Sequence, residues 1–97
     1  MNSQEKELFR LALLRVLDSN RTRYGLGVVA IAHALRLFSF TAANFSGDAK
    51  QFHDAIADEI QYLTDKGLIE EAMKAISPEN RAWRIASEGI ALVDKNP

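Results

Sequence analysis

The stretches QFHDAIADEIQYLTDKGLIE at positions 51–70 and WRIASEGI at positions 83–90 decide the fold. In the first, apolar side chains recur at spacings of four, four and three, which predicts an amphipathic helix. Its apolar stripe is Phe52, Ile56, Ile60 and Leu63. Asp48 with Gln51 three positions later has the form of a capping box, and Gly67 is the residue type that ends a helix. We therefore expect a helix from near Asp48 to Gly67.

A β-hairpin follows this helix in the sequence. We expect strands over 68–74 and 81–86, joined by a turn at 77–80 whose Ser, Pro, Glu and Asn residues are typical of turns. Trp83 and Ile85 share one face by alternation and should pack inward. The hairpin is therefore predicted to have one apolar, inward face.

Three further helices complete the expected fold. They cover about 3–18, 28–38 and 88–94, and Ser87 is placed to cap the last of them. The connector 39–47 holds two aromatic residues that should pack down rather than lie free. These are Phe40 and Phe45. A chain of 97 residues makes one domain. The predicted fold class is mainly α with a small β-hairpin: three helices, a two-stranded hairpin and a short C-terminal helix.

The first helix is apolar around most of its circumference, which is more than one stripe on a surface helix requires. Its apolar residues are Leu8, Phe9, Leu11, Ala12, Leu13, Leu14, Val16 and Leu17. Such a helix can lie at the centre of the core, or a second subunit can cover part of it. We favour a homodimer through the first helix, because so small a domain has little interior in which to hide two faces.

Composition limits the class of protein. Hydrophobic residues make up 47% of the chain, which is enough to bury a core without covalent or metal cross-links. The absence of cysteine excludes disulfides and thiolate zinc sites. Residues 1–7 are polar, so we expect no signal peptide. The longest apolar-rich run, 26–40, is interrupted by His33 and Arg36 and is too short to cross a membrane. We expect a cytoplasmic protein with no membrane partner.

No pattern in the sequence predicts catalysis, a metal or a cofactor. Asp54 and Asp58 are four positions apart, where like charges repel more often than they act as acid and base. The run 25–27, Gly-Leu-Gly, precedes a helix but lacks the lysine and the strand of a phosphate loop. The histidines, His33 and His53, have no metal-binding spacing, and His33 is expected to be partly buried in an apolar helix. We expect no enzyme activity, no metal and no cofactor.

Charge is distributed unevenly, although the net charge is only −1. Residues 1–47 hold six basic groups against three acidic ones, 48–66 hold two against five, and 67–97 hold four against five. A net charge near zero exerts no overall attraction on nucleic acid. An anion-binding surface would therefore use the N-terminal part and the hairpin, and not the third helix.

Two phrases of this chain resemble winged-helix transcription regulators of bacteria. One is YLTDKGLIE at 62–70, since a leucine, a basic residue and Gly-Leu-Ile end the recognition helix of that superfamily. The other is WRIASEGI at 83–90, which resembles the phrase that leaves the wing, with Ala86 where threonine is commoner. The resemblance covers about residues 8–94 in the order of elements. It implies a single winged helix-turn-helix domain, double-stranded DNA as partner and a role in transcription regulation.

A second, narrower resemblance is to a family of small winged-helix proteins of Mu-like prophages. It rests on LALLRVL at 11–17 together with the stretch 56–69. It implies a phage or prophage origin in bacteria and no particular activity.

In a winged helix the third helix would dock in the major groove of DNA. The residues of that helix that could contact DNA are Lys50, Gln51, His53 and Gln61. Carboxylates on the same side would instead face a polyanion, which opposes binding. The alternative is a face that contacts protein, formed by Asp54, Asp58 and Asp65.

Phosphate contacts are expected from two places. Arg21 and Arg23 lie in the loop before the second helix, and the hairpin offers Lys74, Arg81 and Arg84. By strand alternation, Arg84 points away from the inward face of the hairpin. Each set has an alternative, because loop arginines can simply stay solvated and hairpin cations can pair with nearby glutamates. Those glutamates are Glu70, Glu71 and Glu79.

Two hypotheses of different classes remain open. The first is a DNA-binding regulator that acts as a dimer, with phosphate contacts from the arginines and limited base readout by the third helix. The second is a winged-helix protein–protein interaction module that does not bind DNA and uses its acidic third helix. A small apolar pocket between the first and second helices could bind an effector, although no residue demands one.

Overall fold

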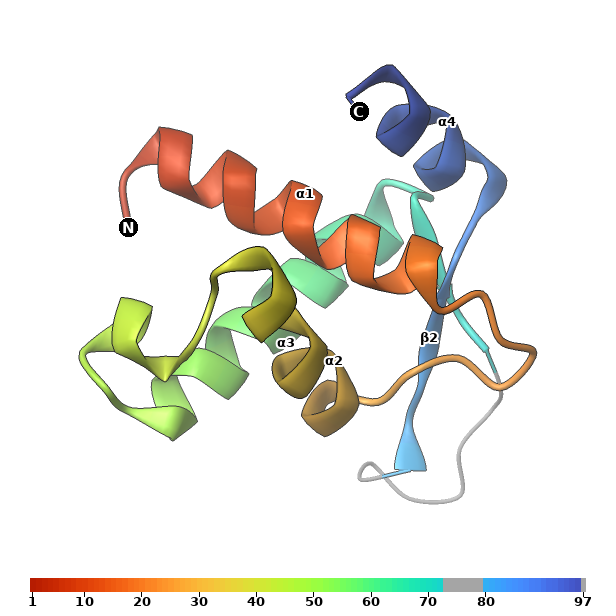
Figure 1. Cartoon of the computed structure of the whole chain (residues 1–97). Coiled ribbons are helices and arrows are strands. Elements are labelled where there is room, and N and C mark those ends of the chain that lie inside the picture. The colour runs from red at the N-terminus through yellow and green to blue at the C-terminus, as the bar shows by residue number, and fades with distance from the viewer. Residues whose placement is uncertain (73–79, 97) are drawn as a thin grey trace.

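The computed structural model describes residues 1–72 and 80–96, and it is mainly helical with a two-stranded antiparallel hairpin (Figure 1). The elements in chain order are α1 (Ser3–Ser19), α2 (Val28–Leu35), the 3₁₀ helices η1 (Arg36–Phe38) and η2 (Ala42–Phe45), α3 (Ala49–Asp65), β1 (Ile69–Glu71), β2 (Trp83–Ile85) and α4 (Ser87–Lys95). The predicted class of a mainly α fold with a small hairpin is confirmed.

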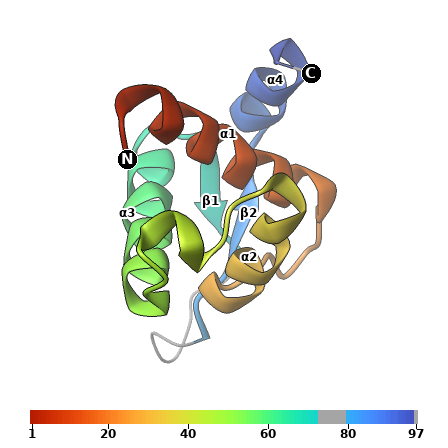
Figure 2. The ribbon, with the colours of Figure 1, turned by 60° about the vertical axis from the view of Figure 1, so that its left-hand side comes forward.

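Helix α1 is the central helix of the fold. It packs against α2, α4 and β2, and in Figure 2 it crosses above α2 and α3 with the strands between them. Its buried residues are Phe9, Ala12, Leu13, Leu14, Val16 and Leu17. Most of the apolar band is therefore covered by the chain itself, as the core-helix interpretation requires. Leu8 is 55% exposed and Leu11 is half-buried, so the band is left incompletely covered at these two leucines.

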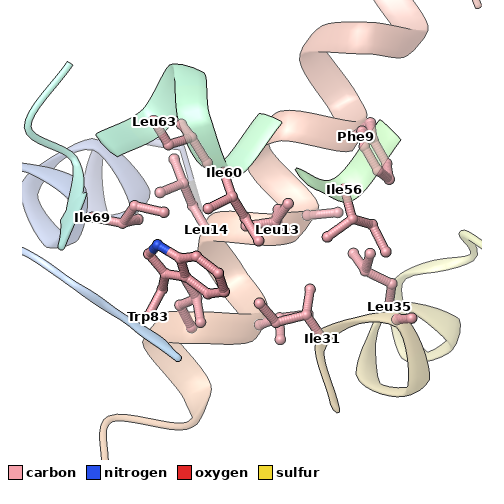
Figure 3. Close-up of a cluster of buried hydrophobic side chains, with 14 of the residues drawn as sticks. Phe9, Leu13, Leu14, Ile31, Leu35, Ile56, Ile60, Leu63, Ile69 and Trp83 are labelled. Carbon is pink, nitrogen blue, oxygen red and sulfur yellow. The ribbon is translucent and has the colours of Figure 1, made fainter. Parts of the chain in front are cut away.

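Helix α3 begins and ends where the sequence predicts. The Asp48 Oδ1 atom accepts hydrogen bonds from the amides of Lys50 at 2.9 Å and Gln51 at 3.2 Å, which satisfies donors that the first helical turn leaves free. Beyond Asp65 the chain turns at Gly67, whose φ of +73° is a left-handed conformation that glycine adopts easily. The predicted apolar stripe, Phe52, Ile56, Ile60 and Leu63, is buried. Figure 3 shows the last three of these side chains in the core.

The hairpin places one apolar face against the helices. Its register pairs Ile69 with Ile85, Glu70 with Arg84, and Glu71 with Trp83. Trp83 and Ile85 are buried, which confirms the predicted alternation. β2 is shorter than its predicted span of 81–86, and β1 begins one residue later than its predicted span of 68–74, whose last two residues are not described. Most of the predicted turn at 77–80, together with Lys74, lies outside the described residues.

A third segment joins the hairpin, and the sequence analysis did not predict it. The amide of Leu26 donates to the carbonyl of Trp83 at 2.8 Å, and the Trp83 amide donates to the Leu26 carbonyl at 2.9 Å. Gly25 permits this approach, because its φ is +71° and a Cβ atom there would lie 2.5 Å from the Trp83 carbonyl oxygen. The loop before α2 is therefore attached to β2, the strand that carries Arg84.

The connector between η1 and α3 is held down by aromatic contacts. The ring of Phe9 lies 5.2 Å from Phe40 and 5.6 Å from Phe45 between centroids, and Phe45 lies 5.3 Å from Phe52. Each such pair contributes about 0.5–1.5 kcal/mol beyond its area burial. The prediction that Phe40 and Phe45 pack down is confirmed.

Helix α4 differs from the prediction at its first residue. Ser87 is the first residue of the helix and not its cap, since Ala86 occupies the cap position without a side-chain hydrogen bond. The reason is that strand pairing continues up to Ala86, whose amide donates to the Leu68 carbonyl at 3.0 Å. A Cβ atom on Gly89 would lie 2.2 Å from that same carbonyl oxygen, so only glycine allows α4 to approach the strand this closely.

Candidate functional site

The outer face of α3 is exposed, as predicted, and it is acidic. Its exposed polar residues are Lys50, Asp54, Asp58, Gln61 and Asp65. The Lys50 Nζ atom lies 3.0 Å from Asp54 Oδ2, and this hydrogen bond is the main reason that the pKa of Lys50 is raised. The Gln61 amide donates to Asp65 Oδ1 at 2.9 Å. Two of the four expected DNA contacts on this helix are therefore engaged by aspartates of the same helix.

The other two candidates on α3 lie near its start. Gln51 is exposed, and its backbone amide contributes to the Asp48 cap. His53 is half-buried on the flank of the helix, with its ring 6.2 Å from the ring of Phe52 between centroids. Of these two side chains, only Gln51 is fully accessible, because His53 is partly covered by the fold. Contact of this helix with bases would therefore be limited.

The hairpin arginines pair with glutamates across the strands. The Arg81 Nε atom donates to both carboxylate oxygens of Glu71, at 3.1 and 3.2 Å, and Arg84 Nε donates to Glu70 Oε1 at 3.1 Å. Arg81 also lies over the ring of Trp83, 5.0 Å from its centroid. These are exposed pairs, which contribute about 0–1 kcal/mol each and exchange partners readily. Lys74 and Glu79 lie outside the described residues.

The loop arginines and Arg84 come together although they are far apart in the sequence. The Arg84 Nη1 atom donates to the Arg23 carbonyl at 3.3 Å, and Arg21 Nε donates to Asp18 Oδ1 at 2.9 Å. The Arg23 guanidinium lies 5.9 Å from the centroid of the Tyr24 ring. A shallow hollow of about 230 Å³ lies between these arginines, and Thr22, Ile85 and Ile90 complete its lining. The attachment of Leu26 to β2 is what brings the loop to the strand.

A groove separates the second half of α3 from the hairpin. Its volume is about 450 Å³, and it is lined by Ala57, Asp58, Ile60, Gln61, Thr64, Glu71, Arg81 and Trp83. The charged groups in this lining are two carboxylates and one guanidinium. The groove thus continues the negative charge of the α3 face toward the hairpin, and a cationic group fits its electrostatics better than a phosphate does.

A partly buried ion pair between α1 and α3 was not predicted from the sequence. Arg10 Nε lies 2.8 Å from Glu59 Oε2, and Arg10 Nη2 lies 3.2 Å from Glu59 Oε1, while the Glu59 side chain is only 5% exposed. The Arg10 guanidinium also stacks over Tyr62, 3.9 Å from the ring centroid. The hydrogen bond to Glu59 is the largest cause of the raised pKa of Arg10. A signal existed, because Glu59 precedes Ile60 and follows Ile56 by three positions, on the inner side of the helix.

The position of His33 contradicts the prediction that it is partly buried. His33 is exposed, and its Nε2 atom lies 2.9 Å from Arg36 Nη2. Ile31 and Leu35, two positions before and after it, point into the core, and two positions along a helix turn a side chain by about 200°. His33 therefore faces away from the core that these two residues enter.

The described residues contain neither a cluster of metal ligands nor a membrane-spanning helix. No group of three or more His, Cys, Asp or Glu side chains within residues 1–72 and 80–96 could hold a metal ion. No helix in that part of the chain is both long and apolar enough to cross a membrane. Comparison of the chain with protein-family models, with curated proteins and with solved structures found no match.

Proposed function

We propose that the protein is a winged-helix DNA-binding protein, a cytoplasmic transcriptional regulator of a bacterium or prophage that acts as a dimer. The observation that carries this proposal is the convergence of Arg21 and Arg23 with Arg84 beside the hairpin. The order of elements supports it, since a long helix with one uncovered face, α3, directly precedes the hairpin in the chain.

In this proposal binding is led by phosphate contacts and not by base readout. Arginine binds phosphate oxygens with two parallel hydrogen bonds, and the exposed pairs that now hold Arg21, Arg81 and Arg84 are weak enough to be exchanged for such contacts. On α3, Lys50 and Gln61 lie beside Asp54 and Asp65, whose negative charges oppose close approach to phosphates. Gln51 and His53 are the other residues of this helix that could make limited base contact. A protein of this kind would bind many sequences with similar affinity.

Fluorescence anisotropy of mixed-sequence duplex DNA, titrated with salt, tests the proposal. We expect micromolar binding that weakens as salt rises, and a double variant, Arg23→Ala with Arg84→Ala, that lowers the magnitude of the salt slope by about 2, or ~0.9 per lost phosphate contact. The matched control is Arg36→Ala with Lys95→Ala, which removes the same charge from exposed positions elsewhere. Absence of binding at low salt, or equal losses in both double variants, would contradict the proposal.

The acidic face of α3 favours a second candidate function, a protein–protein interaction module. Asp54, Asp58 and Asp65 are exposed there with Lys50 as the cation of the same face, and the adjoining groove adds Glu71. Such a face attracts a basic protein segment and repels DNA.

The double variant Asp54→Asn with Asp58→Asn separates the two candidates. If α3 enters the DNA groove, the variant binds duplex DNA more tightly than the natural protein, since two repulsive charges are gone. If α3 is a protein-contact face, DNA affinity is absent or unchanged, and binding of a lysine-rich probe peptide is lost. Anisotropy with labelled DNA and with labelled peptide measures both outcomes.

A further inference from the structure

Leu8 forms a ridge on α1 between two hollows. On one side, a hollow of about 520 Å³ between α1 and α4 is lined by four leucines and by Gln4, Glu7, Arg10 and Asn96. The leucines are Leu8, Leu11, Leu14 and Leu92. On the other side, a hollow of about 320 Å³ between α1 and the connector is lined by Leu8 with Ala12, Phe38 and Phe40, among others. The most exposed leucine of α1 therefore stands between two partly apolar depressions, a shape that suits interlocking with another apolar ridge.

The uncovered face of α1 has a self-complementary pattern. Gln4, Leu8, Leu11 and Arg15 follow one another at spacings of four, three and four, so they lie along one side of the helix. Apolar residues occupy the middle of this side, and Arg15 lies near one end. Glu5 lies near the other end, and both Glu5 and Arg15 line the hollow beside the connector.

We propose that a second copy of this chain docks on this face, with α1 against α1 in antiparallel orientation and a two-fold axis passing between Leu8 and Leu11. A two-fold axis makes each contact occur twice, with the two residues exchanged between the copies. Leu8 of each copy then lies beside Leu11 of the other and enters the hollow against α4. Glu5 of each copy lies at the level of Arg15 of the other, so each end of the interface pairs opposite charges.

Charge complementarity is the reason to choose a second copy over another partner. In the antiparallel arrangement Glu5, in the first turn of one α1, meets Arg15 of the other, and the two helix dipoles also oppose each other favourably. The parallel arrangement would place like charges side by side. Because α1 is only about 26 Å long at 1.5 Å per residue, it cannot supply the ~800 Å² per partner of a standard interface unaided. The surfaces around Leu92 of α4 and Phe38 of η1 must contribute, so we expect a weak, concentration-dependent dimer.

This inference deepens the dimeric state of the proposed function, and it is tested without DNA. Sedimentation velocity over a concentration series measures the dimer dissociation constant of the natural protein, of Leu8→Glu and of Val29→Glu. Val29 is 72% exposed near the start of α2, so it offers an apolar-to-glutamate substitution on a surface outside the proposed interface. We expect Leu8→Glu to raise the dissociation constant at least about tenfold and Val29→Glu to leave it unchanged. A natural protein that stays monomeric at every concentration, or equal effects of the two variants, would overturn the inference.

A charge exchange tests the antiparallel pairing. Arg15→Glu alone and Glu5→Arg alone should each weaken self-association, because each homodimer then repeats a like-charge contact twice. A mixture of the two variants should form a heterodimer. At one end of this heterodimer, Glu5 of the Arg15→Glu variant faces Arg15 of the Glu5→Arg variant. At the other end, the glutamate introduced in the first variant faces the arginine introduced in the second. A mixture that associates no more tightly than either variant would refute this arrangement.

A protein that dimerises without binding DNA would refute only the proposed function, and a monomer that binds DNA would refute only the interface.

Discussion

Arg10–Glu59 and Arg81–Glu71 are both arginine–glutamate pairs, yet they lie in opposite environments. In the first, the side chains are 25% and 5% exposed, and the arginine also covers the ring of Tyr62. In the second they are 48% and 29% exposed, and the pair sits on the hairpin beside the groove next to α3. The first pair is a structural link between two helices. The second is more exposed to solvent, so it contributes little to stability and its arginine can exchange partners readily. The same residue types therefore stabilise the fold in one place and contribute little to it in the other.

The largest effect that would sharpen this comparison is expected from Glu59→Ala. Removing one partner leaves Arg10 partly buried without its counter-charge, and we expect a loss of about 2–3 kcal/mol in the free energy of unfolding, somewhat below the value for a fully buried pair. That loss corresponds to about 10–20 °C in Tm for a domain of this size. Urea denaturation measures it, with Glu70→Ala on the hairpin as the matched control. A difference between these two variants of under about 0.5 kcal/mol would show that burial does not distinguish the pairs.

The next effect concerns what the hairpin glutamates do to DNA affinity. The double variant Glu70→Gln with Glu71→Gln keeps the shape of both side chains but releases Arg84 and Arg81 from their counter-charges. If the hairpin contacts phosphates, we expect affinity for duplex DNA at low salt to rise roughly tenfold.

The control for this variant is Glu7→Gln with Glu88→Gln, which changes the net charge equally at exposed positions on α1 and α4. Anisotropy titrations of both proteins against one labelled duplex compare them directly. An equal gain in both would assign the effect to net charge, and no gain in either would remove the hairpin from the DNA interface.

A smaller effect is expected from Arg10→Lys. Lysine retains the charge but replaces the two-pronged hydrogen bond to Glu59 with a single point contact and loses the planar stacking on Tyr62, so we expect a loss of about 1 kcal/mol in stability. The bond to Glu59 raises the pKa of Arg10 above its already high ordinary value. A raised folded-state pKa gives stability that is present at all lower pH, so the difference between the two proteins should stay constant between about pH 6.5 and 9. Urea denaturation at several pH values would reveal a slope that contradicts this assignment.

The smallest effect is expected from Arg84→Ala. Its pair with Glu70 is exposed and its bond to the Arg23 carbonyl is a single contact of 3.3 Å, so unfolding should change by less than about 0.5 kcal/mol. Thermal melting followed by circular dichroism gives the value. A loss near that of Glu59→Ala would mean that the hairpin pair carries structure and is not free to exchange with a phosphate.

The sequence predicted the parts of this fold whose signals are local. The stripe from Phe52 to Leu63, the Asp48 cap and the turn at Gly67 each depend on residues within a few positions, and each is present. Inward packing of Trp83 followed from strand alternation in the same way.

The parts that escaped prediction depend on distant partners. Glu59 was assigned to neither face of its helix from the sequence, and its partner Arg10 is 49 positions away. For the candidate site, exposure of Asp54 and Asp58 followed from helical periodicity. The meeting of Arg23 with Arg84 did not, because it depends on the approach of Gly25 to β2, which no local pattern announces.

The link between Leu26 and Trp83 has a consequence for how the hairpin opens. Since β2 is hydrogen-bonded to β1 on one side and to Leu26 on the other, it is an interior strand within the described residues. The amides of Leu26 and Trp83 are both donors in this link, so a solvent proton can reach them only when the loop and the hairpin separate. We expect these two amides to exchange with deuterium much more slowly than exposed loop amides, at rates set by separation of the loop from the hairpin.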